Sequence, residues 1–259
     1  MTTFKSTHHT ARKTIVVKLG GSTLEGLNEA FFSNFKKLQE QGYDMIITHG
    51  GGPAINRELE KQQVDSHTLN GIRVTNKDAM EIVQSTLIGK VNPKLVYELN
   101  NAGIPSIGLN GFDNFLLKAE FLDEGIYGLV GEVTKVNTDL LFTLIQNGIV
   151  PVIACVGINH DGQALNINGD TVACSVALAV QANSLLLVTD VAGIRIDDEF
   201  QQLATPSQIE RWIDEEQIYG GMIPKVRGAL NVLNQGVPSV QIVNEHLIGT
   251  TIIREEQMR

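Results

Sequence analysis

Short apolar segments alternate with helical patterns along almost the whole chain, and this alternation limits the possible folds more than any other feature. Six segments are rich in apolar residues and bounded by Gly, Pro or Asn: residues 14–19, 43–48, 104–109, 149–156, 184–189 and 239–243. Their apolar runs are continuous rather than alternating, which is typical of strands in a sheet that is covered on both faces. The sequence therefore predicts six strands in a buried sheet.

The segments between these strands carry helical periodicity. The clearest stripe repeats every four residues from Val83 to Leu99, and Asn-Ala-Gly at 101–103 supplies a helix stop. Two further stripes comprise Val172, Val176 and Val180, and Val226, Leu230 and Leu233. Strands that alternate with helices are typical of an α/β fold. We expect a three-layer αβα sandwich with a mostly parallel central sheet, in which the 83–99 stripe either lines the core or forms a dimer face.

Two segments interrupt the alternation. Residues 115–121 and 129–136 have the pattern of two strands joined by a short turn, so we expect a hairpin there. Residues 203–221 are polar and contain a short helical pattern at 209–213. We divide the chain in the Asn-rich segment 166–170, into an N-terminal tail (1–13), an N-terminal lobe (14–168) and a C-terminal lobe (169–259).

Charge and cysteine content exclude several classes of protein. The 259 residues include 20 Lys and Arg against 29 Asp and Glu, a net charge of −9, and a nucleic-acid binder needs a basic surface. Two cysteines, Cys155 and Cys174, are too few for a disulfide framework or a multi-cysteine zinc site, and Cys155 lies in an apolar run typical of a buried residue. That run, 149–158, is about half of the roughly 20 residues that a membrane span needs, and the first residues are polar, unlike a signal peptide. We expect a cytoplasmic protein.

Two glycine clusters directly follow predicted strands. KLGGS (18–22) ends the first strand, and HGGGP (49–53) ends the second and precedes a helical pattern at 54–63. Glycines in such places let backbone N–H groups approach an anion closely, and a helix N-terminus adds to the attraction. Neither cluster is a Walker-type G-x-x-x-x-G-K-[ST] loop or a dinucleotide-binding G-x-G-x-x-G motif. We expect two anion cradles at strand ends, and we expect His49 to support its loop by hydrogen bonds rather than act as a base.

Two later segments place polar residues on short extended stretches. In NGIRVT (70–75), Arg73 is either a surface residue or a bidentate clamp on a carboxylate, for which a guanidinium is better suited than an ammonium. In NINGD (166–170), Asn166 and Asn168 project to one side of an extended segment. Asp170 is either a helix cap or a carboxylate that fixes two lysines. The residues themselves leave these alternatives open.

Two segments in the C-terminal third also carry charged residues beside glycine. In TDVAG (189–193), Asp190 follows a predicted strand. In GGMIPK (220–225), two glycines lead into a helix whose first turn contains Lys225. A lysine in the first turn opposes the helix dipole and is unfavourable unless an anion lies nearby. Such a departure from local rules often marks a functional site.

Together the six segments resemble the amino acid kinase family, in order and over nearly the whole chain. The resemblance implies that family's fold and the transfer of the ATP γ-phosphoryl group to a carboxylate. It implies that Lys18 and Lys225 hold the transferring phosphoryl group and that Asp170 orients both lysines. The other implied ligand contacts come from Gly20, Gly21 and Asp190, with the two lysines, on the ATP side, and from Gly51, Gly52, Arg73 and Asn166 on the amino acid side, where Arg73 binds the α-carboxylate.

Within the family, the segments are most similar to those of kinases that convert N-acetyl-L-glutamate to N-acetyl-L-glutamyl 5-phosphate in arginine biosynthesis. This similarity implies ATP as co-substrate, Mg²⁺ that arrives on ATP, and no tightly bound cofactor or protein metal site. The short stretch before Thr14 implies a homodimer that arginine does not inhibit. Gly169 departs from the alanine that is common in the family, and we expect it to loosen the helix start. Two alternatives remain: a kinase of another acid (aspartate, glutamate or an aminoadipate derivative), and a non-catalytic regulatory paralogue, which would have no chemical reason to keep Lys18, Asp170 and Lys225 together.

Overall fold

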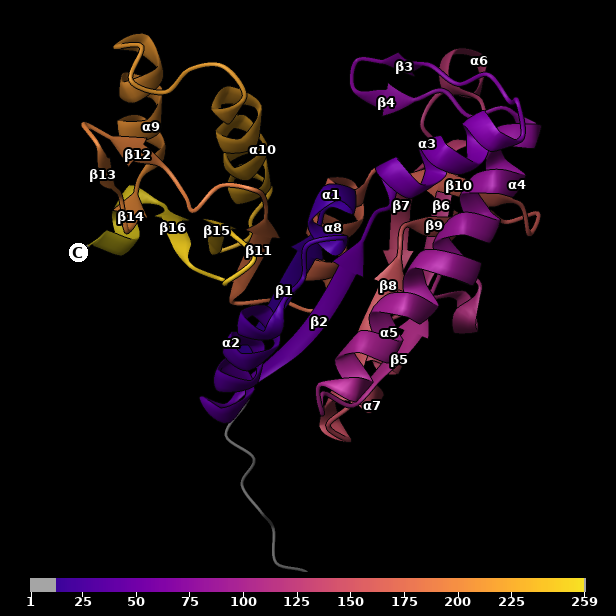
Figure 1. Ribbon diagram of the computed structural model, residues 1–259, viewed down its shortest axis with the longest axis horizontal. Helices are drawn as coiled ribbons and strands as arrows, with labels where there is room; N and C mark the ends of the chain where they lie inside the picture. Colours follow the sequence, from indigo (N-terminus) through magenta and orange to yellow (C-terminus); the bar gives the residue numbers. More distant parts are fainter. Residues whose placement is uncertain (1–12, 259) are drawn as a thin grey trace, which may run out of the picture.

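An eight-stranded sheet crosses the molecule in the computed structural model, which describes residues 13–258, so that residues 1–12 of the predicted tail lie outside the described part. The strand order is β14-β16-β15-β11-β1-β2-β8-β5 (Figure 1). Every neighbouring pair is parallel except β15 and β16. The strands are β1 (Lys13–Leu19), β2 (Tyr43–His49), β5 (Ser106–Leu109), β8 (Val150–Ala154), β11 (Ser184–Val188), β14 (Leu203–Ala204), β15 (Ser239–Val243) and β16 (Gly249–Ile253). The predicted mostly parallel sheet is confirmed.

Helices cover both faces of this sheet. One face carries α2 (Glu29–Glu40) and α5 (Asn92–Asn101), and the other carries α7 (Thr138–Gln146), α8 (Gly169–Ala179) and α10 (Met222–Asn234). Successive side chains of β1 point to opposite faces, so Ile15 and Val17 pack with Phe31 of α2 whereas Val16 packs with the α8 side. Both faces are buried, which explains the continuous apolar runs and confirms the predicted three-layer αβα sandwich.

One continuous helical segment runs from α4 (Lys77–Thr86) through a π-helical turn, η1 (Leu87–Val91), into α5. It carries the predicted four-residue stripe, and Val83, Leu87, Leu95 and Leu99 are buried, so the stripe lines the core. A four-residue repeat drifts by about 40° per step around a regular α-helix, and the wider π turn compensates part of that drift. The segment ends as predicted, before Gly103 with its φ of +77°.

A second set of strands forms a small closed barrel: β6 (Leu117–Phe121), β7 (Val130–Val136), β9 (Val156–Ile158) and β10 (Ala164–Ile167). β6 and β7 pair antiparallel, which confirms the predicted hairpin, although α6 (Glu124–Tyr127) lies in its connection. The prediction of a single strand at 149–156 is wrong, because the chain leaves the central sheet after Ala154 and β9 joins the barrel. All residues from 150 to 158 are buried, so the apolar run continues across the switch and conceals it.

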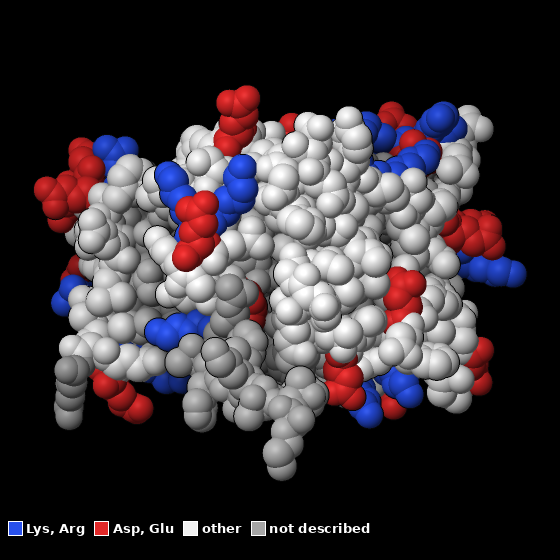
Figure 2. Space-filling model, turned by 90° about the horizontal axis from the view of Figure 1, so that it is seen from below, with Lys and Arg blue, Asp and Glu red and all other residues white. Residues whose placement is uncertain are grey.

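The remaining elements are short: α1 (Gly21–Leu24), α3 (Gly52–Lys61), β3 (Thr68–Leu69), β4 (Ile72–Arg73), η2 (Asp113–Phe115), β12 (Arg195–Ile196), β13 (Glu199–Phe200), α9 (Pro206–Asp214) and η3 (Glu255–Met258). The helix expected at 209–213 is α9. In Figure 1, α3 and the β3–β4 hairpin stand over one end of the sheet, and α9 and α10 over the other. On the face shown in Figure 2, basic side chains are scattered among acidic ones. No helix in the described range is long and apolar enough to cross a membrane.

Candidate active site

The loops after three neighbouring strands meet at one edge of the sheet. β2, β1 and β11 are adjacent and parallel, and HGGGP, KLGGS and TDVAG follow them in that order. The start of α8 lies beside these loops, since a Cβ built on Gly169 would be 3.5 Å from Lys18 Cε and 4.0 Å from Gly50 N. The structure therefore brings segments far apart in the sequence together in the crevice where open α/β sheets bind ligands.

Lys18, the next-to-last residue of β1, forms an ion pair with Asp170, with 3.0 Å between Nζ and Oδ1. The lysine side chain is 19% exposed and the aspartate side chain 57%. Asp170 is not the helix cap: Asn168 Oδ1 accepts hydrogen bonds from the backbone N–H groups of Asp170 (2.8 Å) and Thr171 (3.3 Å). Because Asn168 caps α8, the Asp170 carboxylate is left to hold Lys18, and its position in the first turn also suits the helix dipole.

Lys225, in the first turn of α10, donates to Asp190 Oδ1. This hydrogen bond is the main reason that the pKa of Asp190 lies below its usual value. The anion that the position of Lys225 requires is therefore supplied by the loop after β11. Within residues 13–258 no ion pair joins Asp170 to Lys225, so each lysine has its own carboxylate.

The two ion pairs line one cavity of about 280 Å³. Gly20 borders it directly after β1, Thr23 borders it from α1, and Pro224 and Gly228 border it from α10. The charges of the two lysines and two aspartates cancel, while the N-termini of α8 and α10 add positive potential. Such a cavity suits a polyanion that displaces the carboxylates from the ammonium groups, as expected for phosphates.

The glycine loops pack directly against each other. A Cβ on Gly21 would lie 2.5 Å from Pro53 Cδ and 2.8 Å from Gly52 N, and one on Gly51 would lie 2.6 Å from Leu87 Cδ2. Position 21 must therefore be glycine for the loops to approach this closely, whereas a Cβ at position 51 would require the Leu87 side chain of η1 to move. In contrast, no atom within 4 Å opposes a Cβ on Gly52. Close packing accounts for part of the glycine content that the sequence alone attributes to anion binding.

His49 supports its loop by hydrogen bonds, as predicted. Its Nε2 lies 2.9 Å from Asn92 Nδ2, which also donates to Val152 O at 2.8 Å. Nε2 must accept from this amide, so Nδ1 carries the proton and donates to Gly50 O at 2.9 Å. Burial lowers the pKa of His49 to about 4, so the ring is neutral near pH 7. Asn92 escaped the sequence analysis, although an asparagine inside a helix at the edge of an apolar stripe is a usable signal.

The two cysteines are buried and uncharged, as expected for Cys155. The position of a Cβ on Gly169 is 3.8 Å from Cys155 Sγ, which places this thiol behind the Lys18–Asp170 pair. Burial raises the pKa of Cys155 to about 12 and that of Cys174 to about 11. Neither thiol is a nucleophile at neutral pH.

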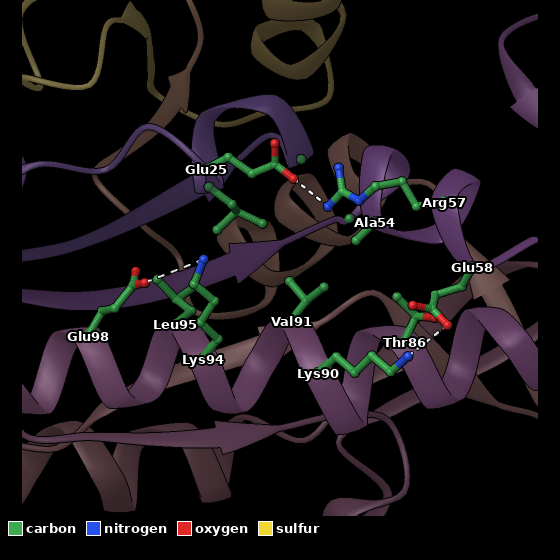
Figure 3. Close-up of a pocket in the computed structure, with 13 residues that line it drawn as sticks. Glu25, Ala54, Arg57, Glu58, Thr86, Lys90, Val91, Lys94, Leu95 and Glu98 are labelled. Carbon is green, nitrogen blue, oxygen red and sulfur yellow. Dashed lines mark hydrogen bonds and ion pairs between the residues drawn. The ribbon is translucent and has the colours of Figure 1, made fainter. Parts of the chain in front are cut away.

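Gly21 and Gly51 also line a second cavity, between α1, α3 and the helix that contains the π turn (Figure 3). Its apolar lining includes Leu24, Val91 and Leu95. Figure 3 shows its charged side chains neutralised in pairs: Arg57 with Glu25 (2.5 Å), Lys90 with Glu58 (2.7 Å) and Lys94 with Glu98 (3.8 Å). This cavity lies behind the glycine loops, and none of the four charged residues of the first cavity lines it.

Arg73 and Asn166 belong to a separate network beside α3. Arg73, in β4, donates from Nη1 to Ser66 Oγ at 2.7 Å and from Nη2 to Asn56 Oδ1, and burial lowers its pKa. Asn56 lies one helical turn beyond Gly52. Asn166 Nδ2 donates to Thr75 Oγ1 at 3.0 Å. Arg73 is thus half-buried and held in place rather than a free surface residue. Its partners Asn56 and Ser66, and Thr75 as the partner of Asn166, were missed by the sequence analysis.

Comparison with known proteins agrees with this architecture. Residues 13–244 match the model of the amino acid kinase family. Acetylglutamate kinase of Halalkalibacterium halodurans is 44% identical over 250 residues, covering 93% of this chain and 96% of that protein. Acetylglutamate kinase of Bacillus subtilis is 42% identical over 233 residues, covering 90% of each.

Solved structures share the fold of this chain. The structure of smu.665 from Streptococcus mutans UA159 is 36% identical, with a TM-score of 0.82, and the match covers 93% of this chain and 99% of that one. Giardia carbamate kinase, at 16% identity, shares the fold with a TM-score of 0.68 over 94% of this chain and 99% of its own. The match to the family model over most of the sequence, together with these relatives, shows that the chain belongs to the amino acid kinase family.

Proposed function

We propose that this protein transfers the γ-phosphoryl group of ATP to the γ-carboxylate of N-acetyl-L-glutamate, giving N-acetyl-L-glutamyl 5-phosphate and ADP as a step of arginine biosynthesis. The observation that carries the proposal is the cavity in which Lys18 and Lys225, each on its own carboxylate, face the loops of two adjacent strands. Relatives that are 42–44% identical and named acetylglutamate kinase support the choice of reaction and substrate.

The chemistry requires no general base. A substrate γ-carboxylate is already ionised at pH 7, so one of its oxygens attacks the γ-phosphorus directly while the bond from that phosphorus to the bridging oxygen breaks. The main obstacle is repulsion between the carboxylate and the polyphosphate. In our assignment Lys18 and Lys225 neutralise the charge of the transferring group, and Asp170 keeps Lys18 directed into the cavity.

ATP is the co-substrate, and we assign its binding to Lys18, Gly20, Gly21, Asp190 and Lys225, with the two lysines and the two glycines on its phosphates. We also propose that Mg²⁺ enters on ATP, where it supplies charge neutralisation for the phosphates. In support, the described residues include no group of three or more His, Cys, Asp or Glu side chains arranged to hold a metal ion. Asp170 and Asp190, the carboxylates of the cavity, are engaged by lysines.

We assign the amino acid to the N-terminal lobe (14–168) and ATP to the C-terminal lobe (169–259). Arg73 would take the α-carboxylate with its planar fork, and Asn166 would help to hold the acetylated amino acid. Gly51 and Gly52 would supply backbone donors where the substrate meets the phosphates. The alternative placement of Arg73 as an exposed surface residue lacks support, since its fork is already ordered by Asn56 and Ser66.

We further propose a cytoplasmic homodimer. The central sheet ends at β5, an edge strand, and Tyr97 of the neighbouring α5 is 69% exposed and Ile107 of β5 is 42% exposed. Large apolar side chains beside an unpaired strand edge support association with a second copy. The buried stripe of the 83–99 helix does not contribute to this surface.

The test is ADP release by the purified protein with Mg-ATP and, separately, N-acetylglutamate, glutamate, aspartate or N-acetyl-2-aminoadipate. Hydroxylamine in the assay traps an acyl phosphate as a hydroxamate. We expect turnover and hydroxamate with N-acetylglutamate. Turnover with another acid alone would reassign the substrate, and no turnover by a folded protein that binds ATP would favour a regulatory paralogue.

A further inference from the structure

Thr75, the last residue of NGIRVT, is completely buried where the β3–β4 hairpin meets the barrel. Its backbone N–H donates to Tyr127 O at 2.9 Å, and its carbonyl accepts from Leu129 N at 2.7 Å. Gly128 pairs with it in an isolated bridge, and a Cβ on this glycine would lie 2.4 Å from Thr75 O. The backbone of Thr75 is therefore fixed to the start of β7.

The Thr75 hydroxyl both donates and accepts a hydrogen bond. It donates to Arg73 O at 2.9 Å and accepts from Asn166 Nδ2 at 3.0 Å. A threonine hydroxyl has one proton to donate, so this proton is committed to Arg73. The hydroxyl thus joins the two residues that we assign to the two polar groups on the α-carbon of the amino acid, its carboxylate and its acetylated nitrogen.

The same contact reaches the phosphoryl-transfer cavity. Asn166 lies in β10, which ends at Ile167, and α8 begins at Gly169 with Asp170 as its next residue. Asp170 holds Lys18. A short, regular stretch of backbone therefore links the Thr75 hydroxyl to the lysine proposed to hold the phosphoryl group.

At its other end, the Arg73 side chain is braced independently. Ser66 and Asn56 each accept from a different guanidinium nitrogen, so the fork cannot rotate without losing a hydrogen bond. Its remaining freedom is displacement of the β4 backbone toward or away from β10. The Thr75 hydroxyl opposes that displacement, since it bridges Arg73 O and Asn166.

We propose that Thr75 is a positioning residue that sets the separation between Arg73 and the phosphoryl-transfer cavity, and so selects the chain length of the amino acid substrate. The inference rests on the proposed function. If Arg73 holds the α-carboxylate and Lys18 lies near the reacting carboxylate, a fixed separation favours one number of methylene groups between them.

The experiment compares Thr75→Val, which removes the hydroxyl at nearly constant volume, with Thr75→Ser, which keeps it. We expect Thr75→Val to raise the KM for N-acetylglutamate about tenfold, as for loss of one bridging hydrogen bond, with the KM for ATP within about twofold of wild type. We also expect its preference in kcat/KM for N-acetylglutamate over N-acetyl-2-aminoadipate, one methylene longer, to fall several-fold. Thr75→Ser should recover most of both properties.

Thr86→Val is the matched control. Thr86 is also buried on an element near the glycine loops, but its hydroxyl has no hydrogen-bond partner among the described residues. Loss of this hydroxyl in Thr86→Val should leave the KM for N-acetylglutamate, the KM for ATP and the chain-length preference unchanged. If Thr75→Val does not fold, Thr75→Cys replaces it and should raise the KM by an intermediate amount.

An unchanged KM and preference in folded Thr75→Val would overturn the inference, and so would Thr75→Ser that is as impaired as Thr75→Val, since the methyl group and not the hydroxyl would then matter. Wild-type protein that does not phosphorylate N-acetylglutamate contradicts the proposed function instead. In that case the same variants are assayed on the acid that the protein does phosphorylate, where the KM for that acid must rise selectively.

Discussion

The groups proposed for phosphoryl transfer and the groups that support them differ in charge and exposure. Lys18 and Lys225 each rely on one ion pair with an aspartate whose side chain is more than half exposed. His49 and Thr75 are neutral and buried, and each is hydrogen-bonded on two sides. Exposed ion pairs contribute little to stability, whereas a buried polar group that loses its partner is costly. The charged groups are therefore free to exchange partners when a polyanion binds, while the neutral network keeps them in position.

The largest effect on activity is expected from removing one of the two lysines that we assign to phosphoryl transfer. We expect Lys18→Ala and Lys225→Ala each to lower kcat by about 100- to 1000-fold, because each ammonium stabilises charge in the transition state. The KM for ATP should change much less. Steady-state kinetics test this, with Lys94→Ala as control, since Lys94 is also ion-paired but lines the second cavity. Near-normal turnover of either variant would remove that lysine from the mechanism.

Acid should lower the free energy of unfolding through the buried, neutral His49. The folded-state pKa of His49, about 4, lies below its ordinary value of 6.5, so between these pH values the unfolded chain binds more protons than the folded one. Stability from this residue is therefore unaffected above pH 6.5 and falls by about 3 kcal/mol in total as the pH drops to 4. Urea unfolding should show that the free energy of unfolding of the wild type falls relative to that of His49→Gln as the pH drops across this range. A pH-independent difference between the two would contradict the buried neutral imidazole.

Arg73 is a charged group inside the neutral network, so replacing its planar guanidinium by an ammonium tests the two regions together. Arg73→Lys keeps the charge but loses the fork that Ser66 and Asn56 hold. We expect the KM for N-acetylglutamate to rise about tenfold with kcat changed by less than about threefold. Initial-rate measurements at saturating ATP decide the matter, and an unchanged KM would exclude Arg73 from the substrate site.

The smallest effect on activity is expected at Gly169, at the start of α8, beside Lys18. A Cβ on Gly169 would meet Lys18 Cε at 3.5 Å and Cys155 Sγ at 3.8 Å, which are ordinary contacts. Gly169→Ala should stabilise the protein by about 0.5–1 kcal/mol, because alanine favours the helix that begins there. Thermal unfolding measures the gain, and kcat should stay within about twofold. Destabilisation would mean that the start of α8 needs the freedom of glycine.

Local patterns in the sequence account for most of the fold and for the charged half of the site. Apolar runs that end on glycine mark β1 and β2, and the four-residue stripe marks the helix from α4 to α5. Lys18, Asp170, Asp190 and Lys225 all lie near a glycine, at a strand end or a helix start, where unusual residues stand out. The family resemblance then gives these positions a common chemistry.

In the neutral half, the supporting role of His49 was predicted, but the hydrogen-bond partners were not, because they are distant in the chain. Thr75 and Asn166 are 91 residues apart, and His49 and Asn92 are 43 apart. Threonine and asparagine are common on surfaces, and apart from the position of Asn92 beside an apolar stripe, no local pattern marks these residues as buried. The ion-pair partner of Lys225 could not be predicted from the sequence either: Lys225 pairs with Asp190, although Asp170 was expected to orient both lysines.

The π turn at Leu87–Val91 also limits how the sequence can evolve. A π turn corresponds to one residue inserted into an α-helix, and if the same residues formed a regular helix instead, everything after the turn would rotate by about 100° relative to everything before it. Leu95 and Leu99 would then turn away from the sheet, and Asn92 would no longer reach His49. The spacing of the stripe and the π turn therefore depend on each other: loss of the turn without loss of a residue would disrupt the core and, with it, the support of the HGGGP loop.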